Sequence, residues 1–110
     1  MKIEKEEKNG VVIYRCEGHL DANTAVKMEE ALRVMIDAGK KKLVIDFSKI
    51  DYLSSAGMRL LLSVTKRLHA AGGKLVLISL QDNVMEIIRM AGFESILNLY
   101  ISEEEALKAI

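Results

Sequence analysis

Two short apolar runs, Leu43-Val44-Ile45 and residues 75–78, constrain the fold of this chain more than any other feature. Their residues do not alternate with polar ones, as they do in a strand that has one face in water. Strands of this kind are usually covered on both faces, which is typical of a sheet with helices packed against it. The two runs therefore predict strands over residues 42–47 and 74–79 in an α/β domain.

The first part of the chain has the pattern of a β-hairpin. Residues 2–8 are mostly charged, Asn9-Gly10 suits a tight turn, and residues 11–17 alternate, with Val12, Tyr14 and Cys16 on one face. A charged first strand is a common protection of a sheet edge against pairing with another chain. We therefore predict a hairpin whose first strand lies at the edge of the sheet.

Helical patterns separate the remaining strands. One begins at the cap residues Asp21, Asn23 and Thr24 and stops at Gly39, and two others cover residues 58–69 and 82–90. A short strand over residues 97–101 precedes a capping box that begins at Ser102 and opens a last helix. The order ββαβαβαβα predicts a single α/β domain over residues 1–110, with a mixed, mostly parallel sheet, an N-terminal hairpin and about four helices. The residues expected to face inward from the second and third helices are Met58, Leu61, Leu62, Thr65, Leu68, Val84, Ile87, Ile88 and Ala91.

Composition excludes several classes of function. The 16 basic and 16 acidic residues cancel, which argues against a nucleic-acid binder that neutralises phosphates. The apolar runs are too short to cross a bilayer, and the charged N-terminus is no secretory signal, so we expect no membrane partner. The lone Cys16 fits a reducing cytoplasm and is expected to be a core residue. Together with His19 and His69 it shows no metal-ligand spacing, so neither a metal nor a cofactor is expected.

No strong catalytic constellation is present either. A Ser-His-Asp triad would need Ser54 or Ser55 beside one of the two histidines, but the G-x-S-x-G elbow is missing around these serines. Gly72-Gly73-Lys74 follows a helix and precedes a strand, which is the reverse of a phosphate-binding loop. The chain is therefore not expected to be an enzyme.

The segment DYLSSAG, residues 51–57, places two hydroxyls and a glycine between two apolar segments. One serine is enough to cap the following helix, and such a cap contributes about 1 kcal/mol. If Ser54 is the cap, Ser55 lies in the first turn with its hydroxyl outward. A glycine inside a helix, such as Gly57, costs roughly 1 kcal/mol of helix propensity relative to alanine. A glycine at such a position often indicates that another backbone or a partner must approach closely. These residues alone favour capping and leave a signalling role open.

A wider stretch, DFSKIDYLSSAGMRLLL, resembles the signature of STAS domains, and in particular of bacterial anti-sigma factor antagonists. The segment GHLDANTA, residues 18–25, resembles the family's G-x-L/I-D-x-x-T/N-A segment. Two further landmarks, Gly72-Gly73-Lys74-Leu75 and Met90-Ala91-Gly92-Phe93, also resemble those of the family. The resemblance covers nearly the whole chain, and its element order agrees with the order predicted above.

The resemblance implies a phosphorylation switch. The matching phosphate acceptor is Ser55, with Ser54, which stands where many members carry aspartate, as the second choice. The implied partners are an anti-sigma factor that is itself a serine kinase and a PP2C-type phosphatase that restores the unphosphorylated form. That form would bind the anti-sigma factor in the cytoplasm and release sigma factor. The residues expected at the partner interface are His19, Asp21, Ser54, Gly57, Met58 and Arg59.

Two other functions remain open for a chain with this resemblance. STAS domains also serve as unphosphorylated scaffolds or subunits in signalling and transport complexes. Nucleotide binding has been attached to some of them, but the sequence contains no glycine-rich phosphate loop that supports it. With no sensor domain or transmembrane segment in the sequence, a free-standing antagonist is favoured.

Overall fold

Five strands and four helices follow one another in the predicted order in the computed structural model, which describes residues 1–110. The strands are β1 (Lys2–Lys8), β2 (Val11–Leu20), β3 (Lys42–Leu53), β4 (Lys74–Ile78) and β5 (Asn98–Tyr100). The helices are α1 (Ala22–Asp37), α2 (Ser55–Ala70), α3 (Asp82–Met90) and α4 (Glu103–Ala109). The predicted α/β class and element order are confirmed.

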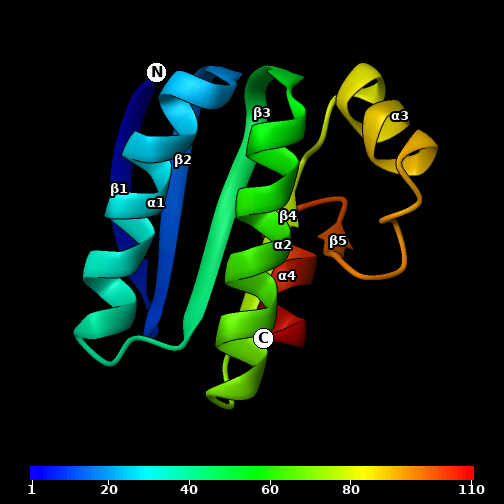
Figure 1. Ribbon diagram of the computed structural model, residues 1–110. Helices are drawn as coiled ribbons and strands as arrows, with labels where there is room; N and C mark the ends of the chain where they lie inside the picture. Colours follow the sequence, from blue (N-terminus) through cyan, green and yellow to red (C-terminus); the bar gives the residue numbers. More distant parts are fainter.

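The strands form one sheet in the order β1-β2-β3-β4-β5, so each strand lies beside its neighbour in the sequence (Figure 1). β1 pairs with β2 antiparallel, and all later pairs are parallel. The hairpin turn is made by Asn9 and Gly10, whose φ angles are 52° and 79°. The charged β1 forms one edge of the sheet, as predicted.

Helices cover both faces of the sheet, but unequally. α1, α2 and α3 pack on one face over a cluster of 22 buried residues, and α4 lies on the other over a cluster of six (Figure 1). In β3, Leu43 and Ile45 belong to the large cluster and Val44 to the small one. This cover on both faces explains why the strand shows no alternation of polar and apolar residues.

Two strands run further than predicted. β2 continues to Leu20 and β3 to Leu53, and these extensions pair with each other through register shifts. Ile50 and Leu53 are buried at a spacing of three residues, because the shifts interrupt the alternation. Because the buried residues are irregularly spaced among polar ones, residues 48–52 lack the alternation of a strand and were not predicted as part of β3. One inward residue was also predicted wrongly: Ala91 follows the last turn of α3 and is exposed.

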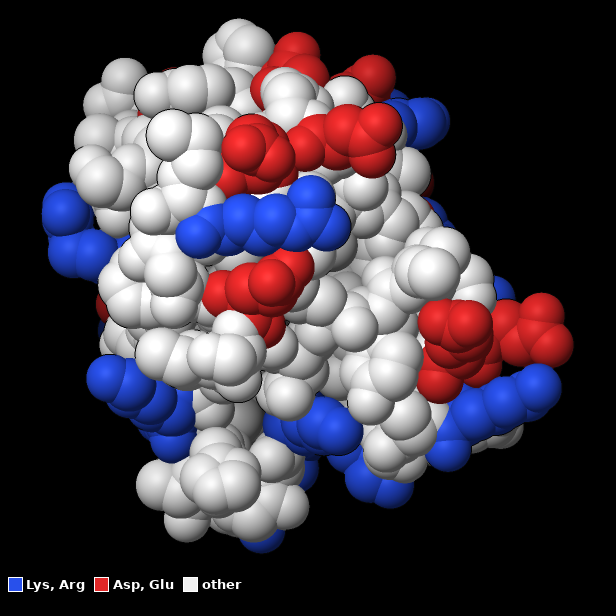
Figure 2. Space-filling model, turned by 90° about the vertical axis from the view of Figure 1, so that its right-hand side faces the viewer, with Lys and Arg blue, Asp and Glu red and all other residues white.

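Basic and acidic side chains alternate along the edge of the domain near α3, β5 and α4. Figure 2 shows this face, on which red and blue side chains lie next to one another. The ion pairs of α3 and α4 include Arg89–Glu94 at 2.9 Å and Lys108–Glu104 at 3.5 Å. None of the four helices has the length and apolar character that a membrane span requires.

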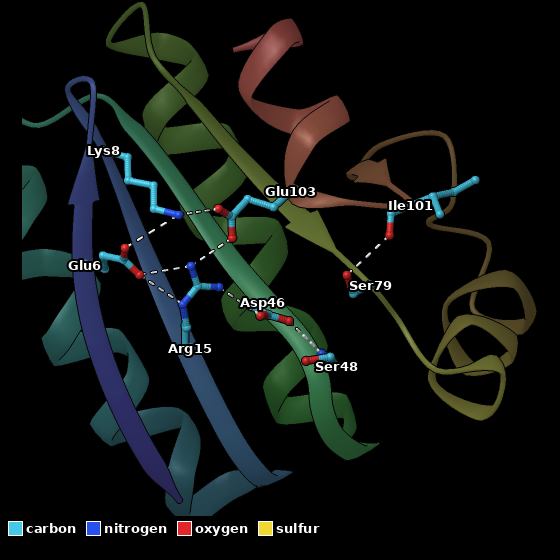
Figure 3. A network of polar contacts seen from close by, with 8 residues as sticks. All are labelled: Glu6, Lys8, Arg15, Asp46, Ser48, Ser79, Ile101 and Glu103. Carbon is cyan, nitrogen blue, oxygen red and sulfur yellow. Dashed lines mark hydrogen bonds and ion pairs between the residues drawn. The ribbon is translucent and has the colours of Figure 1, made fainter.

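A network of charged residues joins α4 to the first three strands (Figure 3). Arg15 of β2 lies 3.0 Å from Glu6, 3.2 Å from Asp46 and 2.9 Å from Glu103, measured between nitrogen and oxygen. Lys8 donates a hydrogen bond of 2.9 Å to the same Glu103 carboxylate. This bond, with the Arg15 contact, lowers the pKa of Glu103 below its ordinary value.

Glu103→Gln is expected to lower the free energy of unfolding by about 1 kcal/mol at pH 7. Because the pKa of Glu103 is lower in the folded protein, its carboxylate stabilises the fold above its unfolded pKa, near 4. This stabilisation is lost as the pH falls through the lower folded pKa, so the difference in stability between the variant and the wild type should shrink as the solution is acidified. Urea unfolding over a series of pH values from neutral to acidic measures this. Glu104→Gln, on the exposed side of the same turn, is the control, and an equal loss in both variants would contradict the prediction.

Candidate functional site

The segment DYLSSAG lies at the carboxyl end of β3, where the chain turns into α2. Leu53 ends the strand and pairs with Leu20, which ends β2. The Ser54 N–H donates a 2.9 Å hydrogen bond to the Leu20 carbonyl, so the turn is tied to the neighbouring strand. The β2–α1 and β3–α2 connections therefore meet at one end of the sheet.

Ser54 is the cap of α2. Its Oγ accepts a 3.1 Å hydrogen bond from the Gly57 N–H, and its backbone is extended, with φ −86° and ψ 172°. The prediction that one serine caps the helix is therefore confirmed, and the capping serine is Ser54.

Ser54→Ala is expected to lower the free energy of unfolding by about 1 kcal/mol, because the Gly57 N–H loses its acceptor. The matched control is Ser55→Ala, one residue further, which should change stability by less than about 0.5 kcal/mol. Urea denaturation followed by circular dichroism compares the two variants. Equal losses in both would show that the cap bond contributes nothing.

Ser55 opens α2 and is exposed. Its side chain takes no part in the hydrogen bond that caps the helix, which leaves its hydroxyl accessible at the helix N-terminus. The first turn of α2 holds no acidic residue, so the positive end of the helix dipole is not yet compensated there. This arrangement can accept a negatively charged group without disturbing the helix.

Gly57 is required by the packing of this turn. A Cβ at this position would lie 2.7 Å from the Leu20 carbonyl oxygen and 2.9 Å from the Leu53 Cδ1 atom. The predicted close approach is therefore confirmed, and the approaching backbone is the end of β2. Gly57 and Met58 are both buried, so they support the surface from below and offer a partner little area of their own.

Of the three remaining predicted interface residues, Arg59 is exposed, and Asp21 and His19 have partners within the chain. Asp21 caps α1 and accepts hydrogen bonds from the N–H groups of Asn23 and Thr24 at 3.0 and 3.1 Å. The bond from Thr24 is the main cause that lowers the pKa of Asp21. His19 Nδ1 lies 2.6 Å from an Asp51 carboxylate oxygen, and both side chains are exposed.

Asp51 was not among the predicted site residues, because a pair between β2 and β3 leaves no signal in the sequence. Its backbone carbonyl also accepts a 2.7 Å hydrogen bond from the Asn83 side chain, which ties α3 to the same end of the sheet. The His19 ring packs edge-on against Tyr52, with 6.0 Å between the ring centres. The region therefore joins the β2–α1 connection, the end of β3 and the start of α3.

An apolar hollow of about 360 Å³ opens between α2 and α3 beside the serines. It is lined by Ser54, Ser55, Met58, Arg59, Leu62, Ile87, Ala91 and Phe93. The exposed Ser55 therefore lies at the border of this hollow.

The histidine–aspartate pair does not form a catalytic triad with either serine. The Ser54 hydroxyl is engaged with Gly57, and neither serine hydrogen-bonds to His19. Cys16 is buried, and burial raises the pKa of its thiol to about 12, so it stays protonated and unreactive at neutral pH. Its predicted place in the core is confirmed.

Comparison with known proteins identifies the family of this chain. The STAS domain family matches residues 2–106. BtrV of Bordetella bronchiseptica, which carries the name of an anti-sigma factor antagonist, is 35% identical over 99% of this chain and 94% of its own length. An anti-sigma factor antagonist from Thermotoga maritima has the same fold, with a TM-score of 0.93 at 17% identity over 98% of this chain and 93% of that one. Bacillus SpoIIAA in its phosphorylated form gives a TM-score of 0.74 at 20% identity, over 98% of each chain. The chain therefore belongs to the STAS domain family, among its anti-sigma factor antagonists.

Proposed function

We propose that this protein is an anti-sigma factor antagonist that is switched off by phosphorylation of Ser55. The observation that carries the proposal is that only one of the two adjacent serines is used to cap the helix. Ser54 is engaged in capping α2, and Ser55 presents a hydroxyl at the same helix end. The likeness to BtrV, which carries the name of an anti-sigma factor antagonist, supports the antagonist part of the proposal.

The proposed partner is an anti-sigma factor that is also a serine kinase. The kinase transfers the γ-phosphoryl group of ATP to the Ser55 Oγ, the hydroxyl proton leaves to a base of the kinase, and ADP is released. The unphosphorylated protein binds the anti-sigma factor and so releases sigma factor. A PP2C-type phosphatase hydrolyses the phosphate ester and restores binding.

The chemistry of the site suits this switch. A phosphate at Ser55 adds about −1.5 to −2 charges at neutral pH. Those charges meet the uncompensated positive end of α2, so the domain itself tolerates them. A partner packed over the same helix end does not tolerate them, because its surface would have to desolvate the phosphate.

The proposed interface surrounds Ser55. Exposed His19 and Arg59 offer direct contacts, and Asp21 and Ser54 hold the two helix starts in place. Gly57 and Met58 shape the surface from below. The hydrogen bond from the Ser54 N–H to the Leu20 carbonyl and the pair of His19 with Asp51 hold this surface at the end of the sheet where β2 and β3 stop.

Capture from lysate of the native cell tests the proposal with three baits: wild type, Ser55→Ala and Ser55→Asp. We expect wild type and Ser55→Ala to retain a kinase-like anti-sigma factor and Ser55→Asp to lose it. Mass spectrometry of the wild-type bait should find phosphate on Ser55. The same partners on all three baits, with no phosphate on residues 51–57, would instead support an unphosphorylated scaffold.

A further inference from the structure

The α2 helix has an unusual charge for a protein whose total charge is zero. It contains Arg59, Lys66 and Arg67 but no Asp or Glu. With 16 basic and 16 acidic residues in the chain, the remainder holds 13 basic and 16 acidic ones. The ion pairs of the structure involve none of the three α2 cations, in contrast to the paired charges of the face in Figure 2. Their charge is therefore available to a partner.

Two of these cations lie on one line of the helix. Ser55, Arg59, Ser63 and Arg67 follow one another at intervals of four residues, and all are exposed. We call these four residues the α2 ridge. In Figure 1, α2 lies between α1 and α3 on the same side of the sheet, so α2 forms the middle of the helical layer.

A hollow borders the ridge on each side. The first is the hollow of about 360 Å³ between α2 and α3. The second, of about 330 Å³, lies between α1 and α2 and is lined by Ala22, Ala25, Val26, Glu29, Ala56, Arg59, Leu60, Ser63, Val64 and Arg67. Arg59 lines both hollows, and Val26 beside the second is 68% exposed. Arginine is one of the residue types enriched at binding hot spots, which cluster near the centre of an interface.

We propose that the α2 ridge is the docking surface for an acidic, amphipathic helix of the anti-sigma factor, with Arg59 as its main contact. The proposal rests on the proposed function and adds the chemistry of the partner. Carboxylates of that helix pair with Arg59 and Arg67, and its apolar side chains enter the two hollows. Glu29 is the one acidic side chain that lines either hollow, so basic residues dominate the surface.

The same geometry gives the phosphate a specific effect. Ser55 and Arg59 are four residues apart on one helix, which brings their side chains within reach of each other. A phosphate on Ser55 therefore pairs with Arg59 and removes it from the carboxylates of the partner. Phosphorylation thus neutralises the centre of the docking surface and also adds a group that repels an acidic partner.

Titration calorimetry with the captured anti-sigma factor tests the docking surface at 50 and 200 mM NaCl. We expect Arg59→Gln to weaken binding at least about tenfold and to reduce its salt dependence. The matched control is Arg89→Gln, which removes the same charge from α3 at an arginine already paired with Glu94. It should change affinity by less than about twofold. Circular dichroism of both variants checks that the fold is intact.

The outcomes separate this proposal from the proposed function. If Ser55→Asp loses the anti-sigma factor while Arg59→Gln binds like wild type, the docking surface is wrong and the antagonist function stands. Equal weakening by Arg59→Gln and Arg89→Gln would also overturn the docking surface, because only net charge would then matter. If wild type binds no anti-sigma factor, both proposals fall.

Discussion

Phosphorylation of Ser55 is expected to weaken binding to the anti-sigma factor by roughly 30- to several-thousand-fold, equivalent to about 2–5 kcal/mol. Two effects contribute to this loss of affinity. The phosphate brings about −1.5 to −2 charges to a surface that the partner must desolvate. It also stands at the head of a helix whose cations are otherwise unpaired, and so competes for them.

Titration calorimetry with unphosphorylated and fully phosphorylated protein measures this loss. Ser55→Ala, treated with the same kinase and ATP, should keep the affinity of unphosphorylated wild type. Ser95→Asp adds a charge at an exposed position before β5 and should have little effect. A change below about threefold on phosphorylation would show that Ser55 lies outside the interface.

The domain itself should change little on phosphorylation, because the phosphate meets free N–H groups at the start of α2. Amide chemical shifts are expected to move in the first turn of α2 and at neighbouring residues of β2 and β3. Widespread shifts, or a refolded α2, would mean that the switch acts through a conformational change.

Gly57→Ala is expected to lower the free energy of unfolding by about 1–3 kcal/mol, the usual cost of overfilling a packed site. The sign of the change in the free energy of unfolding is informative, because replacing glycine by alanine inside a helix normally stabilises a protein by about 1 kcal/mol. Here the added methyl group would lie 2.7 Å from the Leu20 carbonyl oxygen. Because that carbonyl belongs to rigid backbone, the start of α2 must move away from β2.

Urea unfolding of Gly57→Ala and Ser63→Ala tests this. Ser63 is exposed on the same helix, so alanine there should be neutral or slightly stabilising. The position of Ser55 depends on the same packing, so Gly57→Ala should also weaken partner binding. Stabilisation by both substitutions would mean that the helix start adjusts freely.

Most of the fold could be predicted from local patterns. The hairpin turn, the caps at Asp21, Ser54 and Ser102, and the helix periods depend on residues close in the sequence. The bounds of α3 were predicted to the residue, since an acidic first residue and a strong apolar period define it. The extension of β3 was missed, because irregular pairing with β2 replaced the alternation that identifies a strand.

The site could be predicted only in part, for the same reason. The two serines and Gly57 are adjacent in the sequence, so their arrangement follows from the start of one helix. The pair of His19 and Asp51 joins two different strands, and the network around Arg15 joins three strands and a helix. Such contacts appear only after the chain has folded, and single residues carry no sign of them.

The order of the strands also bears on how this protein is made. Every strand of the sheet pairs with the strand that precedes it in the chain. During synthesis, the strand with which each new strand pairs has therefore been made before it. From β2 onward, a single helix with its turns connects each strand to the next. The sheet can therefore grow in the order of synthesis, and the last parts to join are β5 and α4, whose first turn binds Arg15 through Glu103.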